Sequence, residues 1–366
     1  MVGFVDAVLR AGYKGPLSLE IFNDEFRGAP AISTARGAKS SLIWLEERLH
    51  ERATARGDQV LAAKLQATRP EAEAQHIAFI ELRGASDRLP GIQEKLALIG
   101  CQSSGADSNQ AACIRVLPGS GELHVSTIGL AAKDPRSAVL RARSLGCEVS
   151  ETAETCELPD GSQVQMVQSG MAKQAGNLPQ IESICRAVPV AEFDAWSSLS
   201  RVLLGDAQSF GFLKHAPSGV IRGRSLCGVG ATFELETSTH SETQVAEAAI
   251  QRRITRITLA VRNLAATLTM LRDAGSLALE LPEHYYDDLE ARFLPTPTLI
   301  AELREQRMLY DRHGSGELFQ ALVPLNSGGL CLQLLERKGG YPLVSTDAAN
   351  AYVANAALER WLSGNH

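Results

Sequence analysis

The chain has 366 residues, an apolar content of 45% and a net charge of −6 at pH 7. That length suffices for two or three domains with buried cores, and the acidic balance gives no electrostatic reason to expect nucleic acid or an anionic membrane as partner. No apolar run approaches the roughly 18 residues of a membrane span, and the N-terminus lacks the basic and apolar segments of a signal peptide. We therefore expect a cytoplasmic protein.

Seven cysteines are scattered along the chain, and none of them forms a C-x-x-C pair. An odd number of isolated cysteines does not indicate a disulfide framework. We interpret them as small buried side chains in a reducing compartment.

The first 27 residues contain a single αβ unit. A helix is predicted in VGFVDAVLRAGY, a Gly-Pro break follows, and LSLEIF, which contains Glu20, is typical of a strand. One face of the predicted helix carries four apolar residues: Phe4, Val5, Val8 and Leu9. A unit of this size cannot bury its own faces, so we expect it to need a partner and to be poorly anchored.

Residues 28–74 are rich in Ala, Arg and Glu, and SSLIWLEERLHERA has a helical period. This composition predicts a helical linker between the first unit and the rest of the chain. A further helix is expected in the tail, residues 351–366.

An internal repeat organises the region after residue 75. VSTIGLAAKDPRSAVLRARSLGC, from Val125, aligns without gaps to ITRITLAVRNLAATLTMLRDAGS, from Ile254. Each copy is a strand, a polar turn residue and a helix that ends at glycine. The same strand–helix order occurs in HIAFIEL…LPGIQEKLALIGC and in IESICRAVPVAEFDAWSSLSRVLLG. Four such starts with strand candidates between them predict an α+β protein of four βαβββ modules in two pairs, over residues 75–170 and 178–350.

This order of paired βαβββ modules resembles the vicinal oxygen chelate fold of glyoxalases and extradiol dioxygenases. Three segments, LPEHYYDDLEARF, MLYDRHGSGELFQALVP and GGLCLQLLERKGGY, are similar in order and spacing to 4-hydroxyphenylpyruvate dioxygenases. The resemblance implies a substrate-orienting role for Gln320. It also implies an Fe(II) site of two histidines and one carboxylate.

The N-terminal segment GYKGPLSLEIFNDEFR is similar to the last strand of a sugar-phosphate isomerase/epimerase-type barrel. In such barrels the acid of this strand binds a divalent metal (Mg, Mn or Co), a role that the resemblance assigns to Glu20. A barrel fused to a dioxygenase-like region is the layout of bifunctional bacterial 3-dehydroshikimate dehydratases. The resemblance thus implies that residues 1–27 are the remnant of a barrel and that the chain is truncated.

The iron ligands that the resemblance implies are all replaced in this chain. The two histidine positions fall on Ser183 and Arg256, and the carboxylate position falls on Gln333. A serine hydroxyl is a poor Fe(II) ligand, arginine has no lone pair to donate, and glutamine removes the negative charge. Glu336 lies three residues beyond Gln333 and points to the opposite face of its strand, so it cannot substitute. Arg256 is left to pair with an acid such as Glu336 or to bind an anionic ligand.

The corresponding positions of the first module pair are His76, Thr127 and Gln165. Only the histidine of this set is a strong metal ligand, so we expect no metal site there.

Two classes of function remain open. One is a degenerate region without a cofactor that supports a barrel dehydratase through oligomerisation, stability or sensing. Its partners would be a second copy or a separate barrel, and its ligand an aromatic or carboxylic acid. The other is an active enzyme, an Fe(II)-dependent 4-hydroxyphenylpyruvate dioxygenase-type oxidoreductase or a metal-dependent dehydratase with other ligands. The replaced triad favours the first and predicts that this chain alone is inactive.

Overall fold

The computed structural model describes most of the chain and leaves short gaps between the described segments. The described residues are 1–18, 31–65, 74–101, 113–144, 147–150, 152, 154–169, 179–204, 207–217, 219–228, 230–238, 253–325, 329–342 and 348–364.

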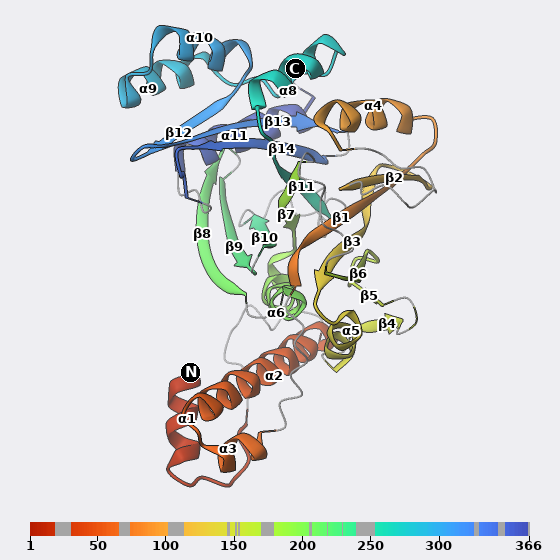
Figure 1. Ribbon diagram of the computed structural model, residues 1–366, viewed down its shortest axis with the longest axis vertical. Coiled ribbons are helices and arrows are strands. Elements are labelled where there is room, and N and C mark those ends of the chain that lie inside the picture. The colour runs from red at the N-terminus through yellow and green to blue at the C-terminus, as the bar shows by residue number, and fades with distance from the viewer. Residues whose placement is uncertain are drawn as a thin grey trace.

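Three helices form a layer at one end of the molecule, shown in red and orange in Figure 1. They are α1 (Val2–Arg10), α2 (Ala31–Ala55) and α3 (Gln59–Lys64). Asp6 of α1 is buried and accepts two hydrogen bonds from Arg56, at 2.8 and 2.7 Å, which joins α1 to the end of α2. Of the predicted apolar face, Val5 is buried and Phe4 is 73% exposed. The α1 face that meets α2 includes Asp6 and is partly polar.

The first sheet has six strands in the order β2-β1-β3-β6-β5-β4. Its strands are β1 (Ala74–Gly84), β2 (Ile114–Pro118), β3 (His124–Ala132), β4 (Glu148–Ser150), β5 (Thr155–Glu157) and β6 (Gln163–Gln168). Two helices belong to it, α4 (Leu89–Ile99) and α5 (Pro135–Ser144).

The second sheet has eight strands in the order β12-β13-β14-β11-β7-β10-β9-β8. Its strands are β7 (Gln180–Ala187), β8 (Gln208–Ala216), β9 (Gly219–Cys227), β10 (Thr232–Ser238), β11 (Ile254–Ala260), β12 (Leu309–His313), β13 (Gly316–Pro324) and β14 (Cys331–Lys338). Its helices are η2 (Val190–Glu192), α6 (Phe193–Leu204), α8 (Leu264–Asp273), α9 (Glu283–Phe293), α10 (Pro297–Glu305) and α11 (Ala348–Leu362). The α9–α10 pair lies between α8 and β12 in sequence and at the far end of the molecule from α1 in Figure 1.

Both sheets repeat one plan. The strands that open paired modules lie side by side and antiparallel, β1 with β3 and β7 with β11. Each opening strand also pairs in parallel with the closing strand of its own module, as in β3 with β6 and β11 with β14. The four predicted strand–helix starts are β1–α4, β3–α5, β7–α6 and β11–α8. The tandem arrangement in two pairs is therefore confirmed.

The first module differs from the other three. Among the described residues, α4 is followed by β2 alone, and a short turn then leads straight into β3. The other three modules have three strands after their helix. Among the described residues, three of the four expected βαβββ modules are complete, and the first sheet accordingly has six strands.

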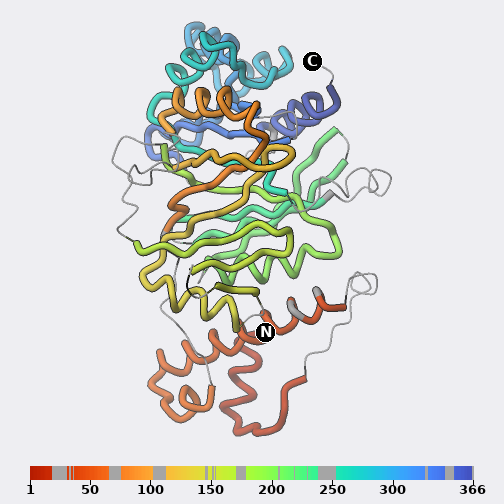
Figure 2. The backbone as a smooth tube through the Cα atoms, turned by 90° about the vertical axis from the view of Figure 1, so that its right-hand side faces the viewer, coloured from red at the N-terminus to blue at the C-terminus, as the bar shows by residue number. Residues whose placement is uncertain are grey.

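One hydrophobic core spans both sheets. Ile80 and Ile128 of the first sheet belong to the same buried cluster as Ile184, Ile257 and Leu332 of the second. Figure 2 shows the α1–α3 layer at one end of the molecule, beyond the strands of both sheets. Residues that alternate with these core residues face the other side of each sheet, which we call the inner face. No helix in the described part of the chain is both long and apolar enough to cross a membrane.

Candidate functional site

The three positions to which the resemblance assigns the iron ligands come together on the inner face of the second sheet. Ser183 on β7 and Gln333 on β14 both pair with Thr258, which lies between them on β11. Arg256 precedes Thr258 by two residues and therefore shares its face. Each of the three positions directly precedes a residue of the hydrophobic core (Ile184, Ile257 and Leu334), so its side chain points to the face opposite the core.

Ser183 is buried and donates a hydrogen bond to the Thr258 hydroxyl at 2.8 Å. A neutral hydroxyl pair of this kind satisfies both side chains and offers no anionic or imidazole ligand to a metal. The Ser183 position is thus occupied by a hydrogen-bonded polar pair.

Arg256 is held by two carboxylates from the neighbouring module. Its guanidinium donates to Glu234 at 2.9 Å and to Glu236 at 3.2 Å, both on β10. Lys214 on β8 completes the group, with its ammonium 2.8 Å from Glu236 and 4.0 Å from Glu234. We call these four residues the inner-face charge network. Two cations and two anions balance each other, so the network is neutral.

The pKa directions agree with this balance. Burial alone would raise the pKa of Glu236, but Lys214 and Arg256 outweigh it and hold that pKa far below its usual value. Burial opposes the charge on Lys214, and Glu236 and Glu234 outweigh it, so the pKa of Lys214 is raised. The pKa of Arg256 is also raised, against the effect of burial, by the acidic groups around it. All three groups therefore remain charged throughout the neutral range.

Pairing of Arg256 with an acid was one of the alternatives that the sequence left open, and the acids are Glu234 and Glu236 rather than Glu336. Glu336 accepts a hydrogen bond at 2.8 Å from the backbone N–H of Leu264, at the start of α8. It lies on the opposite face of β14 from Gln333 and stabilises a helix N-terminus. Glu336 therefore does not take part in the inner-face contacts. This agrees with its place in the strand, three residues after Gln333, which turns it to the opposite face.

One group of potential metal ligands lies on this face. Ligand atoms of Cys185, Glu234 and Glu236 all lie within 4.8 Å of one another. Two of the three are the carboxylates that Arg256 and Lys214 neutralise, and burial keeps the Cys185 thiol protonated by raising its pKa far above the usual value. The positive charge that a metal would bring is thus already supplied by two side chains.

An Fe(II) site of the dioxygenase type does not fit these residues. The implied ligand positions hold a hydroxyl, a guanidinium and an amide, and a fixed cation stands where a metal would need donors. Like charges about 4 Å apart repel by roughly 4 kcal/mol at an effective dielectric of 20.

Gln320 lies on the same inner face but toward the other edge of the sheet. It is half-buried on β13 and is opposite Leu335 of β14 and Leu309 of β12. β14 separates β13 from the Arg256 strand. Glu20, the metal ligand implied for the N-terminal unit, lies outside the described residues.

Sequence reasoning missed the partners of Arg256. Glu234 and Glu236 alternate in the strand TFELETS, so they point to one face, and this is the signal that could have suggested an acidic pair. Lys214 offered no comparable signal, because its approach to Glu236 depends on the pairing of β8 with β9 and of β9 with β10.

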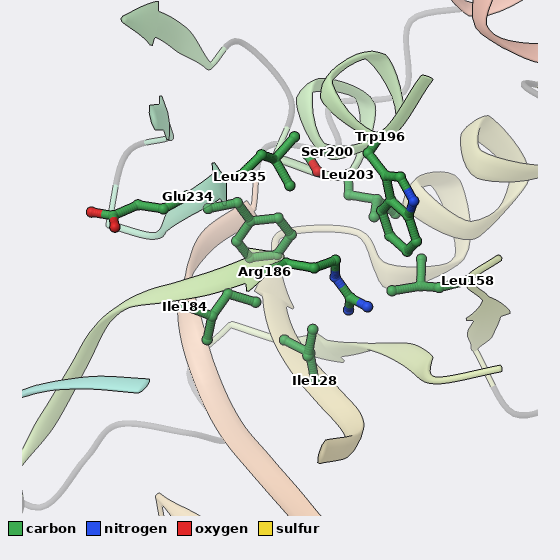
Figure 3. Close-up of a pocket in the computed structure, with 10 residues that line it drawn as sticks. Ile128, Leu158, Ile184, Arg186, Trp196, Ser200, Leu203, Glu234 and Leu235 are labelled. Atoms are coloured by element: carbon green, nitrogen blue, oxygen red, sulfur yellow. The ribbon is translucent and has the colours of Figure 1, made fainter. Parts of the chain in front are cut away.

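A second polar group includes Arg186, which is shown with Trp196 in Figure 3. Arg186 of β7 is buried and forms an ion pair with Asp160 from the first sheet, and its guanidinium carbon lies 4.4 Å from the centre of the Trp196 ring. Burial lowers the pKa of Arg186 to about 9. The adjoining cavity has a volume of about 10 Å³, room for about one water molecule. Glu234 borders this cavity, but its carboxylate points away from it in Figure 3, so the charged group of Glu234 does not enter the cavity.

The paired modules, their parallel and antiparallel register and the position of the site on an inner face define a protein of the vicinal oxygen chelate fold. No model of a known protein family matches the chain.

Two curated relatives are 3-dehydroshikimate dehydratases. The protein from Pseudomonas putida is 28% identical over an alignment 422 residues long, which covers 100% of this chain and 64% of the relative. The protein from Pseudomonas aeruginosa is 27% identical over 408 residues, which cover 98% of this chain and 64% of the relative. The chain thus spans 64% of the length of the curated relatives that it matches.

Solved structures agree with these relatives. A xylose isomerase-like TIM barrel/4-hydroxyphenylpyruvate dioxygenase fusion protein superposes with a TM-score of 0.80 at 25% identity, over 98% of this chain and 64% of that one. A variant of 4-hydroxymandelate synthase from Streptomyces coelicolor shares the fold, with a TM-score of 0.63 at 16% identity over 78% of this chain and 99% of that one. The resemblance inferred from the sequence is confirmed: the chain is homologous to 3-dehydroshikimate dehydratases and contains their 4-hydroxyphenylpyruvate dioxygenase-like region.

Proposed function

We propose that this chain is a non-catalytic, 4-hydroxyphenylpyruvate dioxygenase-like region that supports a dehydratase barrel of the kind found in its longer relatives. The observation that carries the proposal is the position of Arg256, fixed by Glu234 and Glu236 where an iron ligand is implied. Residues 1–27 are proposed as part of the barrel, residues 28–74 as the connection, residues 75–170 and 178–350 as the two module pairs and residues 351–366 as a closing helix.

The charge network restricts what the inner face can bind. A carboxylate ligand at Arg256 would have to displace Glu234 or Glu236, which already balance the two cations. Burying an additional unpaired anion beside them costs several kcal/mol. The proposed ligand-binding part of the face is therefore the end near Gln320, which lies between leucines and suits an aromatic or neutral group.

The decisive experiment compares iron binding by the parent chain and by the triple variant Ser183→His, Arg256→His, Gln333→Glu. Each protein is incubated anaerobically with Fe(II), desalted and analysed for bound iron. We expect no retained iron in the parent and close to one equivalent in the triple variant, because the variant supplies two imidazoles and a carboxylate and removes the cation. The double variant that keeps Gln333 is the matched control and should retain less iron.

Near-stoichiometric iron in the parent, abolished by Glu234→Gln or Cys185→Ala, would overturn the proposal. It would favour the alternative of an active metal-dependent enzyme that uses the Cys185, Glu234 and Glu236 group. Oxygen consumption with 4-hydroxyphenylpyruvate is measured on the same samples, and we expect none from the parent.

Dehydratase activity is tested separately on the same chain. We expect no consumption of 3-dehydroshikimate in the presence of Mg²⁺, Mn²⁺ or Co²⁺, because Glu20 is one ligand of a site that needs several. If the chain consumed 3-dehydroshikimate and Glu20→Gln abolished that activity, the chain would contain a complete dehydratase active site.

A further inference from the structure

Two cysteines of the first sheet bring their sulfur atoms within 2.8 Å of each other. Cys101 follows the last turn of α4, and Cys113 precedes β2. Non-bonded heavy atoms ordinarily rest about 3.5–4.0 Å apart, and a disulfide bond is about 2.05 Å long. The two sulfur atoms are therefore closer to each other than non-bonded atoms ordinarily are.

Backbone hydrogen bonds hold both cysteines in place. The N–H of Cys101 donates to the carbonyl of Leu96 at 2.8 Å, within a helix end that turns at Gly100, where φ is +91°. The carbonyl of Cys113 accepts from Ile80 of β1 at 2.9 Å. The approach of the sulfur atoms is thus a property of the helix end and of the sheet, because neither backbone can withdraw without breaking these bonds.

We propose that Cys101 and Cys113 form a disulfide bond when the protein meets a low-molecular-weight disulfide such as oxidised glutathione. The thiolate of one cysteine attacks a sulfur of the oxidant and releases one glutathione thiolate. The thiolate of the other cysteine then attacks the mixed disulfide and releases the second. The two protein thiols lose two protons and two electrons, and one oxidised glutathione becomes two reduced molecules.

Because both cysteines are buried, the oxidant reaches them only in molecules in which the end of α4 has opened transiently. Cys101 is 0% and Cys113 is 1% exposed. The hydrogen bond to Cys113 and burial raise the pKa of Cys101 well above its usual value, so the reactive thiolate is scarce in the closed structure. Oxidation is consequently slow in the native protein and accelerates under conditions that loosen the end of α4.

The disulfide bond would link the end of α4, a helix at the junction of the two sheets, to the start of β2. α4 packs against α8 of the second sheet, and Lys95 of α4 donates to the carbonyl of Pro324 at 3.3 Å. A disulfide from residue 101 to residue 113 closes the segment between α4 and β2 and restricts the unfolded chain. Oxidation therefore stabilises the contact between the first sheet and the second.

Peptide mapping tests the proposal directly. The full chain is incubated with oxidised glutathione, in buffer and in a urea concentration below the unfolding transition, and then alkylated after denaturation. Trypsin releases both cysteines in the peptide of residues 96–115, which lies between the cleavage sites after Lys95 and Arg115. We expect this peptide to resist alkylation and to be two hydrogens lighter. Cleavage before Asp107 should leave its halves joined until a reductant is added.

Variants separate this bond from non-specific oxidation. Cys101→Ala and Cys113→Ala should abolish the linked peptide and the rise in Tm on oxidation, which we expect to be roughly 5 °C in the parent. Cys185→Ala, at a buried position on the other sheet, should retain both effects. Alkylation of Cys101 and Cys113 to the same extent as Cys185 in every condition, or linkage to other cysteines, would overturn the proposal.

Discussion

The two sheets share a module plan but fill their inner faces by different means. In the first sheet, the Phe79 ring covers Gly129 and the Arg115 guanidinium carbon lies 3.8 Å from the centre of that ring. In the second sheet, the hydroxyl pair of Ser183 and Thr258 stands at the positions that match Phe79 and Gly129, and the inner-face charge network lies next to it. An apolar ring in one sheet is thus replaced by hydrogen-bonded and ionic groups in the other, on the same backbone plan.

The difference shows that this fold does not by itself impose a metal centre. Pairing of opening and closing strands fixes where side chains converge, but residue identity decides whether the converging groups are apolar, ionic or metal-binding. In this chain the described groups that converge are an aromatic ring with a cation in the first sheet and carboxylates with two cations in the second.

The largest expected effect comes from removing the central cation of the network. Arg256→Met leaves Glu234 and Glu236 facing each other with Lys214 alone, and a buried ion pair that loses one partner costs about 3–5 kcal/mol. Arg115→Met in the first sheet loses a cation–π contact and should cost about 1 kcal/mol. Urea unfolding of both variants measures the contrast.

A double variant sharpens that result. Arg256→Met combined with Glu236→Gln removes one cation and one anion, so it should recover a large part of the stability lost by Arg256→Met alone. Equal stability of the single and double variants would mean that packing of the arginine side chain, rather than charge balance, is what the network provides.

The two inner faces should also differ in their response to acid. The folded pKa of Glu236 lies below its unfolded value of 4.5, so its stabilising contribution is present above pH 4.5 and is lost as the pH falls through the folded pKa. We expect unfolding free energy to fall with pH in that range and Glu236→Gln to flatten the fall. An unchanged slope in the variant would place the acid sensitivity elsewhere.

The glycines beneath the two aromatic rings allow a smaller test. A methyl group at Gly129 would overlap the Phe79 ring, which is 4% exposed and cannot move aside, so Gly129→Ala should cost about 1–3 kcal/mol. A methyl group at Gly223 would meet Phe212, which is only half-buried on the edge strand β8 and can swing away. Gly223→Ala should therefore cost less, and thermal unfolding of the pair reports the difference.

The smallest effect is expected at the serine of the replaced triad. Ser183→Ala removes the hydrogen bond to Thr258 and should cost about 1 kcal/mol without changing metal content. A change in bound metal on this substitution would contradict the assignment of Ser183 to a neutral hydroxyl pair.

Much of the architecture could be predicted from local patterns. The gapless repeat located β3–α5 and β11–α8, because a strand and a helix each leave their own period in the apolar residues. The short strands β4 and β5, and the contact of Asp6 with Arg56, were not anticipated. Three-residue strands carry too little pattern, and the face that a terminal helix buries depends on its neighbour.

The sequence by itself determined the residue types, and Ser183, Arg256 and Gln333 are neither the histidines nor the carboxylate that the resemblance implies. Only the tertiary structure decided that Arg256 is neutralised by Glu234 and Glu236, and that Cys101 meets Cys113. These groups are separated along the chain, and their meeting depends on strand register and on where a helix ends. A shift of one residue in that register would turn each side chain to the other face of the sheet, which no spacing in the sequence records.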